Sequence, residues 1–137
     1  MAKTFTAPFA QTTKTSTAVL TTASVISSDS ATNTQLIATA GTDGALVTSV
    51  SMIPRATVTA TALYLFLSKD GGTTLRLIDS ELMAAYTMAA TTAVPETKFT
   101  NVNEVTPIRL EAGDKLYASI GVALASGIVA KCEWTDF

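Results

Sequence analysis

Short runs of β-branched and large apolar residues recur along the chain from residue 17 onward, and each run ends at Gly, Asn, Asp, Pro or Ser. This pattern is typical of β-strands that are separated by turns about every eight to twelve residues. Helical periodicity is scarce. The pattern predicts nine strands, at Ala18–Ile26, Gln35–Ala40, Ala45–Ile53, Thr57–Ser68, Thr74–Ser80, Thr97–Val102, Ile108–Leu110, Lys115–Leu124 and Ile128–Thr135.

The clearest alternation of apolar and other residues lies near the C-terminus. It runs through Leu116, Ala118, Ile120, Val122 and Leu124, and it resumes after Ala125–Gly127 through Ile128, Ala130, Cys132 and Trp134. A period of two places each set on one face of a strand, so both sets are expected in the core. The intervening turn predicts that the two strands form an antiparallel hairpin.

Three glycine-containing stretches could be ligand loops or turns. The sequence KDGGTT at 69–74 lacks the spacing of a phosphate loop, and it lacks the alternating acids of a calcium loop. It is therefore interpreted as a hairpin corner, as is GTDG at 41–44, because Asp-Gly supplies the positive φ angles of such turns. In LEAGDKL at 110–116 we expect Gly113 to adopt a positive φ and Asp114 to bind nearby backbone amides.

These elements favour an all-β domain, an antiparallel two-sheet sandwich of jelly-roll or Greek-key type, over a closed barrel. Ser80–Glu96 interrupts the strand pattern and is expected to be a crossover loop with a short helix, ended by Pro95. Residues 1–16 are Thr-rich, and Phe5 and Phe9 flank Pro8. This segment is either a frayed terminus or an extended N-terminal arm that lies on a partner through Phe5, Pro8 and Phe9. The single domain is expected to span 17–137.

The amino-acid composition limits the classes of function that are compatible with this chain. Charged residues are 15% of the chain against the roughly 25% of soluble domains, and Thr occurs 25 times. A surface this poor in charge suits a subunit that is packed against neighbours. The net charge is −2 with nine scattered basic residues, which offers no stripe for nucleic acid, and no apolar run predicts a membrane span. The lone Cys132 excludes an internal disulfide and is expected to be a buried hydrophobe.

The sequence offers little for catalysis. The chain has no His, which removes histidine-based triads and histidine zinc sites. Asp79 and Glu81 would point the same way on a strand, but a solvated strand end explains them better than a catalytic or calcium-binding pair. We therefore expect no enzyme activity, cofactor or metal. A carbohydrate-binding sandwich stays open as an alternative, and it needs at least two aromatics exposed on one face, from Trp134, Tyr64, Tyr86 and Tyr117.

Residues 45–137 carry YLFLSKDGGTTLRLI, a Thr/Ala-rich middle, PIRLEAGDKLYASIGVAL and a final strand pair. In this arrangement the chain resembles the small β-sandwich decoration or cement proteins of tailed bacteriophages. The resemblance implies a structural protein of the virion, assembled in the host cytoplasm, that binds the major capsid protein on the outer head surface. It also implies a homo-oligomer, a dimer or trimer. Tail, neck and fibre proteins of the same viruses have similar sandwiches, so those locations are alternatives.

Overall fold

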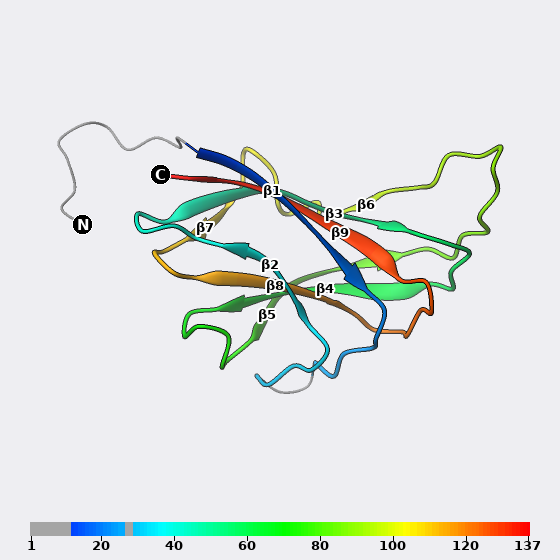
Figure 1. The fold of residues 1–137 in the computed structure, drawn as a ribbon, viewed down its shortest axis with the longest axis horizontal. Coiled ribbons are helices and arrows are strands. Elements are labelled where there is room, and N and C mark those ends of the chain that lie inside the picture. Colours follow the sequence, from blue (N-terminus) through cyan, green and yellow to red (C-terminus); the bar gives the residue numbers. More distant parts are fainter. Residues whose placement is uncertain (1–11, 27–28) are drawn as a thin grey trace.

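The computed structural model describes residues 12–26 and 29–137, and it is an antiparallel sandwich of two sheets (Figure 1). No helix occurs among these residues. The nine strands are β1 (Thr12–Leu20), β2 (Gln35–Thr39), β3 (Ala45–Pro54), β4 (Thr61–Ser68), β5 (Arg76–Met83), β6 (Thr97–Lys98), β7 (Ile108–Leu110), β8 (Lys115–Ile120) and β9 (Ile128–Asp136). The predicted all-β sandwich is therefore confirmed.

The first sheet has the order β1-β9-β3-β6, with β7 also paired to β3, and the second has the order β2-β8-β4-β5. The strand pairs enclose one another along the chain. The innermost pair is β4 with β5, and around it β3 pairs with β6 and β7, β2 pairs with β8, and β1 pairs with β9. Because β6 and β7 pair with successive parts of β3, they act as one interrupted strand. Two four-stranded sheets connected in this way make a jelly roll.

The main core lies between the two sheets. Its largest fully buried side chains include Phe99, Ile37, Met52, Leu63 and Leu65. The predicted core faces of the last two strands are confirmed, except that Val122 lies beyond β8 and remains 43% exposed.

A second, smaller core lies on the outer face of the sheet that contains β4. Phe66 is fully buried there against Ala31 and Leu75, with Ile26 and Tyr117 packed around it. Ile26 and Ala31 belong to the connection between β1 and β2, which passes beneath this sheet in Figure 1. This connection is tied to the sheet by the Ser24 amide, which donates to the Ile120 carbonyl at 2.8 Å.

Two hairpin predictions are wrong. β8 and β9 lie in different sheets, so 121–127 crosses the sandwich, and 40–44 likewise carries the chain from β2 in one sheet to β3 in the other. Alternation identifies the buried face of each strand, but backbone hydrogen bonds do not depend on side chains and leave the neighbouring strand unspecified. The corner at 69–75 does join a true hairpin, because β4 and β5 pair antiparallel.

Several element boundaries also differ from prediction. The first strand is Thr12–Leu20 and not Ala18–Ile26, so residues 12–16 of the predicted arm are part of β1. The connection 84–96 contains no helix, contrary to the expected short one. The Thr residues that disfavour a helix there leave an extended loop. Phe5, Pro8 and Phe9 lie outside the described residues.

Candidate functional site

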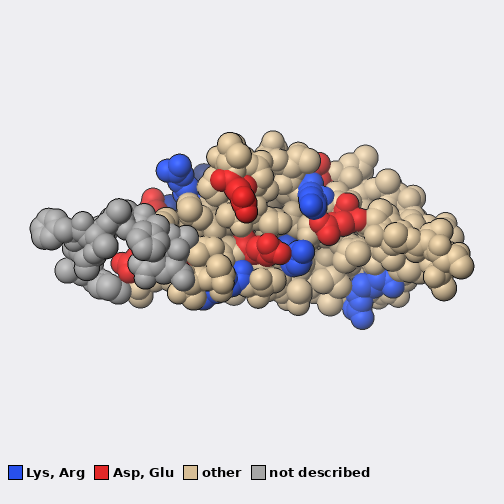
Figure 2. Space-filling model, turned by 90° about the horizontal axis from the view of Figure 1, so that it is seen from above, with Lys and Arg blue, Asp and Glu red and all other residues tan. Residues whose placement is uncertain are grey.

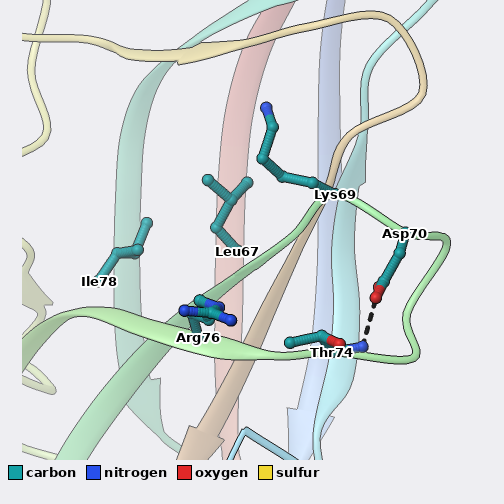
Figure 3. Close-up of a pocket in the computed structure, with 6 residues that line it drawn as sticks. All are labelled: Leu67, Lys69, Asp70, Thr74, Arg76 and Ile78. Atoms are coloured by element: carbon teal, nitrogen blue, oxygen red, sulfur yellow. Dashed lines mark hydrogen bonds between the residues drawn. The ribbon is translucent and has the colours of Figure 1, made fainter.

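A hollow of about 350 Å³ lies beside the β4–β5 hairpin corner (Figure 3). It is lined by Leu67, Lys69, Asp70, Thr74, Arg76 and Ile78. Leu67 and Ile78 give it apolar walls, and the charged side chains lie at its rim. Its size is at the lower end of the range for small-molecule sites.

The polar groups of this hollow are already bound within the protein. The Asp70 carboxylate accepts hydrogen bonds from the Thr74 amide at 2.8 Å and from the Ser68 hydroxyl at 2.9 Å. The hydrogen bonds from Thr74 are the main cause that lowers the pKa of Asp70 to about 2. Lys69 Nζ lies 2.8 Å from Asp114 Oδ2, and this hydrogen bond raises the pKa of Lys69. These contacts stabilise the corner of a hairpin and leave little free chemistry for a ligand.

The turn at 110–116 has the predicted geometry. Gly113 has a φ of 79°, and the Asp114 carboxylate accepts a hydrogen bond from the Glu111 amide at 2.9 Å. Asp114 is 4% exposed, and its carboxylate also binds Lys69 of the neighbouring corner. A buried carboxylate with two donors is a satisfied structural group.

Asp79 and Glu81 lie on the same side of β5, as their spacing predicts, but they are half-buried and not a solvated strand end. Glu81 Oε1 accepts from the Thr100 amide at 3.2 Å and from the Thr100 hydroxyl at 2.9 Å. Asp79 Oδ1 accepts from Asn101 Nδ2 at 3.2 Å. Both acids therefore fasten the connection after β6 to the edge of β5. Within the described part of the chain, no group of three or more His, Cys, Asp or Glu could hold a metal ion.

The four aromatic residues considered for carbohydrate stacking do not form an exposed platform. Trp134 is only 9% exposed and belongs to the main core, while the three tyrosines are half-buried. The rings of Tyr64 and Phe66 lie 6.3 Å apart, and the Tyr86 hydroxyl bonds to the Ala93 carbonyl at 3.2 Å. A stacking platform needs an accessible ring face, and none of these four residues is classed as exposed.

The surface feature that stands out is an end of the sandwich with almost no charge. Three segments make up this uncharged end: loops 55–60 and 121–127, and residues 84–95 of the connection 84–96. Arg55 is the only charged residue in these ranges, and Glu96, which completes the third connection, has its Oε1 3.8 Å from Lys98 Nζ. Figure 2 shows that the end of the molecule on the right, where loop 84–95 projects in Figure 1, is nearly free of Lys, Arg, Asp and Glu on the face in view.

The opposite end has a different composition. Its three turns are shorter in total, at 40–44, 69–75 and 111–114, yet they contain five charged residues: Asp43, Lys69, Asp70, Glu111 and Asp114. Charge is therefore distributed unequally between the two ends of the same domain.

The loops of the uncharged end are held together by specific hydrogen bonds. Val58 and Tyr86 exchange backbone hydrogen bonds of 2.9 and 3.0 Å, and the Met88 amide donates to the Thr57 hydroxyl at 3.0 Å. Tyr86 also stabilises its own loop, because its hydroxyl lies 2.9 Å from the Thr92 hydroxyl. These bonds give an exposed Ala- and Thr-rich surface a defined shape.

The uncharged end has no distinctive signal in the sequence. AAYTMAATTAVP at 84–95 carries no charge, but neither do the longer stretches 15–28, 30–42, 56–68 and 116–130. The significance of 84–95 depends on two other loops, 55–60 and 121–127, which are distant in sequence. Only the fold brings the three together.

Cys132 is fully buried in β9, as expected for a small hydrophobe, and burial is the main cause that raises the pKa of its thiol to about 12. Between about pH 9 and pH 12 the folded protein keeps the thiol proton, whereas the unfolded chain releases it. The free energy of unfolding is therefore highest, as far as Cys132 is concerned, below pH 9 and falls as the pH rises toward 12. We expect native Cys132 to react with a thiol reagent at pH 8 at least about a hundredfold more slowly than in the urea-unfolded chain. Equal rates in the two states would contradict this burial.

No protein family, curated protein or solved structure matches this chain. The described residues include no helix that is long and apolar enough to cross a membrane. The surfaces of this chain and its resemblance to phage decoration proteins therefore have to suggest its function.

Proposed function

We propose that the protein is a structural component of a virion that binds the outer capsid surface and stabilises the head, and that its uncharged end makes this contact. The observation that carries the proposal is that charge-poor, hydrogen-bonded loops lie together at one end of the domain. The phage decoration proteins that the chain resembles suggest the partner, the major capsid protein. Jelly rolls serve in viral capsids and also in lectins and cupins, so the fold by itself does not choose among these functions.

The physical properties of the uncharged end suit a repeated contact between proteins. Ala loses no side-chain rotamer freedom on burial, and Thr loses less than the long charged side chains. Among these residues only Arg55 carries a charge that must stay in water or gain a partner when this end is bound. The loops are already ordered by the bonds of Tyr86 and Val58, which lowers the conformational entropy lost on docking.

The other surfaces support this orientation. The hollow beside the hairpin corner has its polar groups bound internally, and Asp79 and Glu81 hold a neighbouring connection in place. The turns with five charges lie at the far end of the domain, where they would face solvent when the uncharged end is bound. The Phe5, Pro8 and Phe9 segment is proposed as an additional contact to an adjacent capsid subunit.

The first test is the location of the protein in purified particles of the virus that encodes it. Quantitative mass spectrometry should find several hundred copies per particle if the protein covers the head. A handful of copies would place it in the tail or neck, and its absence from the particle would contradict the proposal.

The second test uses binding to capsids from which the protein has been removed. Ala90→Glu with Thr91→Glu adds charge at two exposed positions of loop 84–95, and we expect binding to weaken at least tenfold, because the docked charges lose water without gaining a partner. Thr42→Glu with Ala112→Glu adds the same two charges at exposed positions of the opposite end, so it is the matched control and should bind like the wild type. Deleting residues 2–11, which spares β1, should also weaken binding. Unchanged binding by the double variant of loop 84–95 would rule out the uncharged end as the contact.

A further inference from the structure

The sandwich has one edge strand that carries none of the usual protection against pairing. β1 is the outer strand of its sheet, and no described strand pairs with its free side. It is nine residues long and pairs with β9 in an unbroken one-to-one register, from Thr12 opposite Asp136 to Leu20 opposite Ile128. Such an edge presents a row of unpaired backbone donors and acceptors.

The other edges of the two sheets are protected. β2 is five residues long and has a register shift between Leu36 and Ala38. β5 also has a register shift in its ladder, and it carries Arg76, Asp79 and Glu81. β6 and β7 are two and three residues long. Short strands, irregular registers and charged side chains are the devices by which proteins prevent edge pairing. β1 lacks the first two, and its one charged residue is Lys14.

Lys14, the single charged residue of β1, does not place its charge at the free edge of the strand. Lys14 Nζ lies 2.6 Å from Asp136 Oδ2, so its ammonium group is held toward the neighbouring strand β9. The remaining residues of β1 are Thr, Ser, Ala, Val and Leu. Thr13, Thr15, Thr17 and Val19 are exposed and alternate with residues that pack inward from Ser16 to Leu20. This outer row is β-branched throughout, which favours cross-strand packing.

The sequence of β1 is also complementary to itself. If two copies pair antiparallel about a two-fold axis at Ser16, all nine residues overlap, Thr15 lies opposite Thr17 of the second copy, and Thr13 lies opposite Val19. Lys14 then lies opposite Ala18, so like charges do not meet. Inward-facing residues stay opposite inward-facing residues, which keeps the two cores continuous across the pair.

We propose that β1 is the dimerisation strand and that its partner is β1 of a second copy of this chain, in the antiparallel register centred on Ser16. The contact is isologous, so it closes at two copies. β2 lies beneath β1 on the same side of the sandwich, where the Ser16 hydroxyl donates to the Ile37 carbonyl. The paired sheets therefore bring the two β2 strands near each other, and Leu36, which is 45% exposed, adds apolar area to the contact. The proposal is independent of the virion role, since loops 55–60, 84–95 and 121–127 contribute nothing to it.

A charge-exchange experiment on the full-length protein tests whether β1 is the dimerisation surface. The wild type should be a dimer by sedimentation velocity at micromolar concentration. Thr15→Glu with Thr17→Glu places like charges opposite each other in the dimer, and so does Thr15→Lys with Thr17→Lys, so each double variant should self-associate at least tenfold more weakly. An equimolar mixture of the two variants should restore the dimer mass, because every Glu then faces a Lys.

The controls separate pairing from damage to the fold. Thr42→Glu and Thr42→Lys, on an exposed turn away from β1, should remain dimeric. Circular dichroism should show the same strand content in every variant, and restoration by mixing cannot occur with unfolded chains. A monomeric wild type, a trimer, or double variants that still self-associate would overturn the proposal. Each of these results concerns the isolated protein and leaves the capsid-binding test unaffected.

Discussion

Phe66→Ala is expected to lower the free energy of unfolding by about 3–5 kcal/mol, the usual cost of removing a buried aromatic side chain. Phe66 is fully buried in the smaller core, where it contacts the β1–β2 connection through Ala31 and the hairpin corner through Leu75. Alanine would leave a cavity between the sheet and the connection that covers it. Urea unfolding followed by circular dichroism measures the change.

Phe66→Leu is the matched control, because it keeps an apolar side chain of nearly the same volume. We expect it to cost less than about 1.5 kcal/mol. Hydrogen exchange adds a local measurement: the Ser24 amide, which bonds to the Ile120 carbonyl, should lose protection in Phe66→Ala. A loss of stability below about 1 kcal/mol in Phe66→Ala would show that the connection does not pack on this face.

Gly44→Ala is expected to destabilise the protein by about 2–5 kcal/mol, for two reasons that add. Gly44 has a φ of 90°, which costs an L-residue about 1–2 kcal/mol. A Cβ atom at this position would also lie 2.6 Å from the Leu110 carbonyl oxygen, so the turn between β2 and β3 or the end of β7 must move. Overpacking of this kind adds about 1–3 kcal/mol.

Gly71→Ala separates the two contributions. Gly71 has a similar φ of 79°, but a Cβ atom there would have no neighbour within 4 Å. It should therefore show only the backbone cost of about 1–2 kcal/mol. Thermal or urea unfolding of both variants under the same conditions gives the comparison. Equal destabilisation by the two substitutions would mean that the close approach to Leu110 has no energetic consequence.

The candidate surfaces could be predicted only in part. The spacing of Asp79 and Glu81 predicts that they lie on one side of a strand, which is confirmed, but it does not predict their hydrogen bonds to Asn101 and Thr100. The uncharged end and the free edge of β1 were not foreseen, because both depend on which strands become neighbours. The same limit explains the two wrong hairpins: the turns at 40–44 and 121–127 were identified as breaks between strands, but they connect different sheets.

Local sequence patterns were enough to predict the secondary-structure class, most of the strands and the buried faces of β8 and β9. These properties follow from local periodicity, as Leu116, Ala118 and Ile120 illustrate, because a period of two fixes one side of a strand wherever that strand lies. Only the tertiary structure decided the order of strands in the sheets, the small core around Phe66, and the gathering of three uncharged loops at one end. Backbone pairing is nearly independent of side-chain identity, so the choice among partners depends on how all nine strands fill a common core.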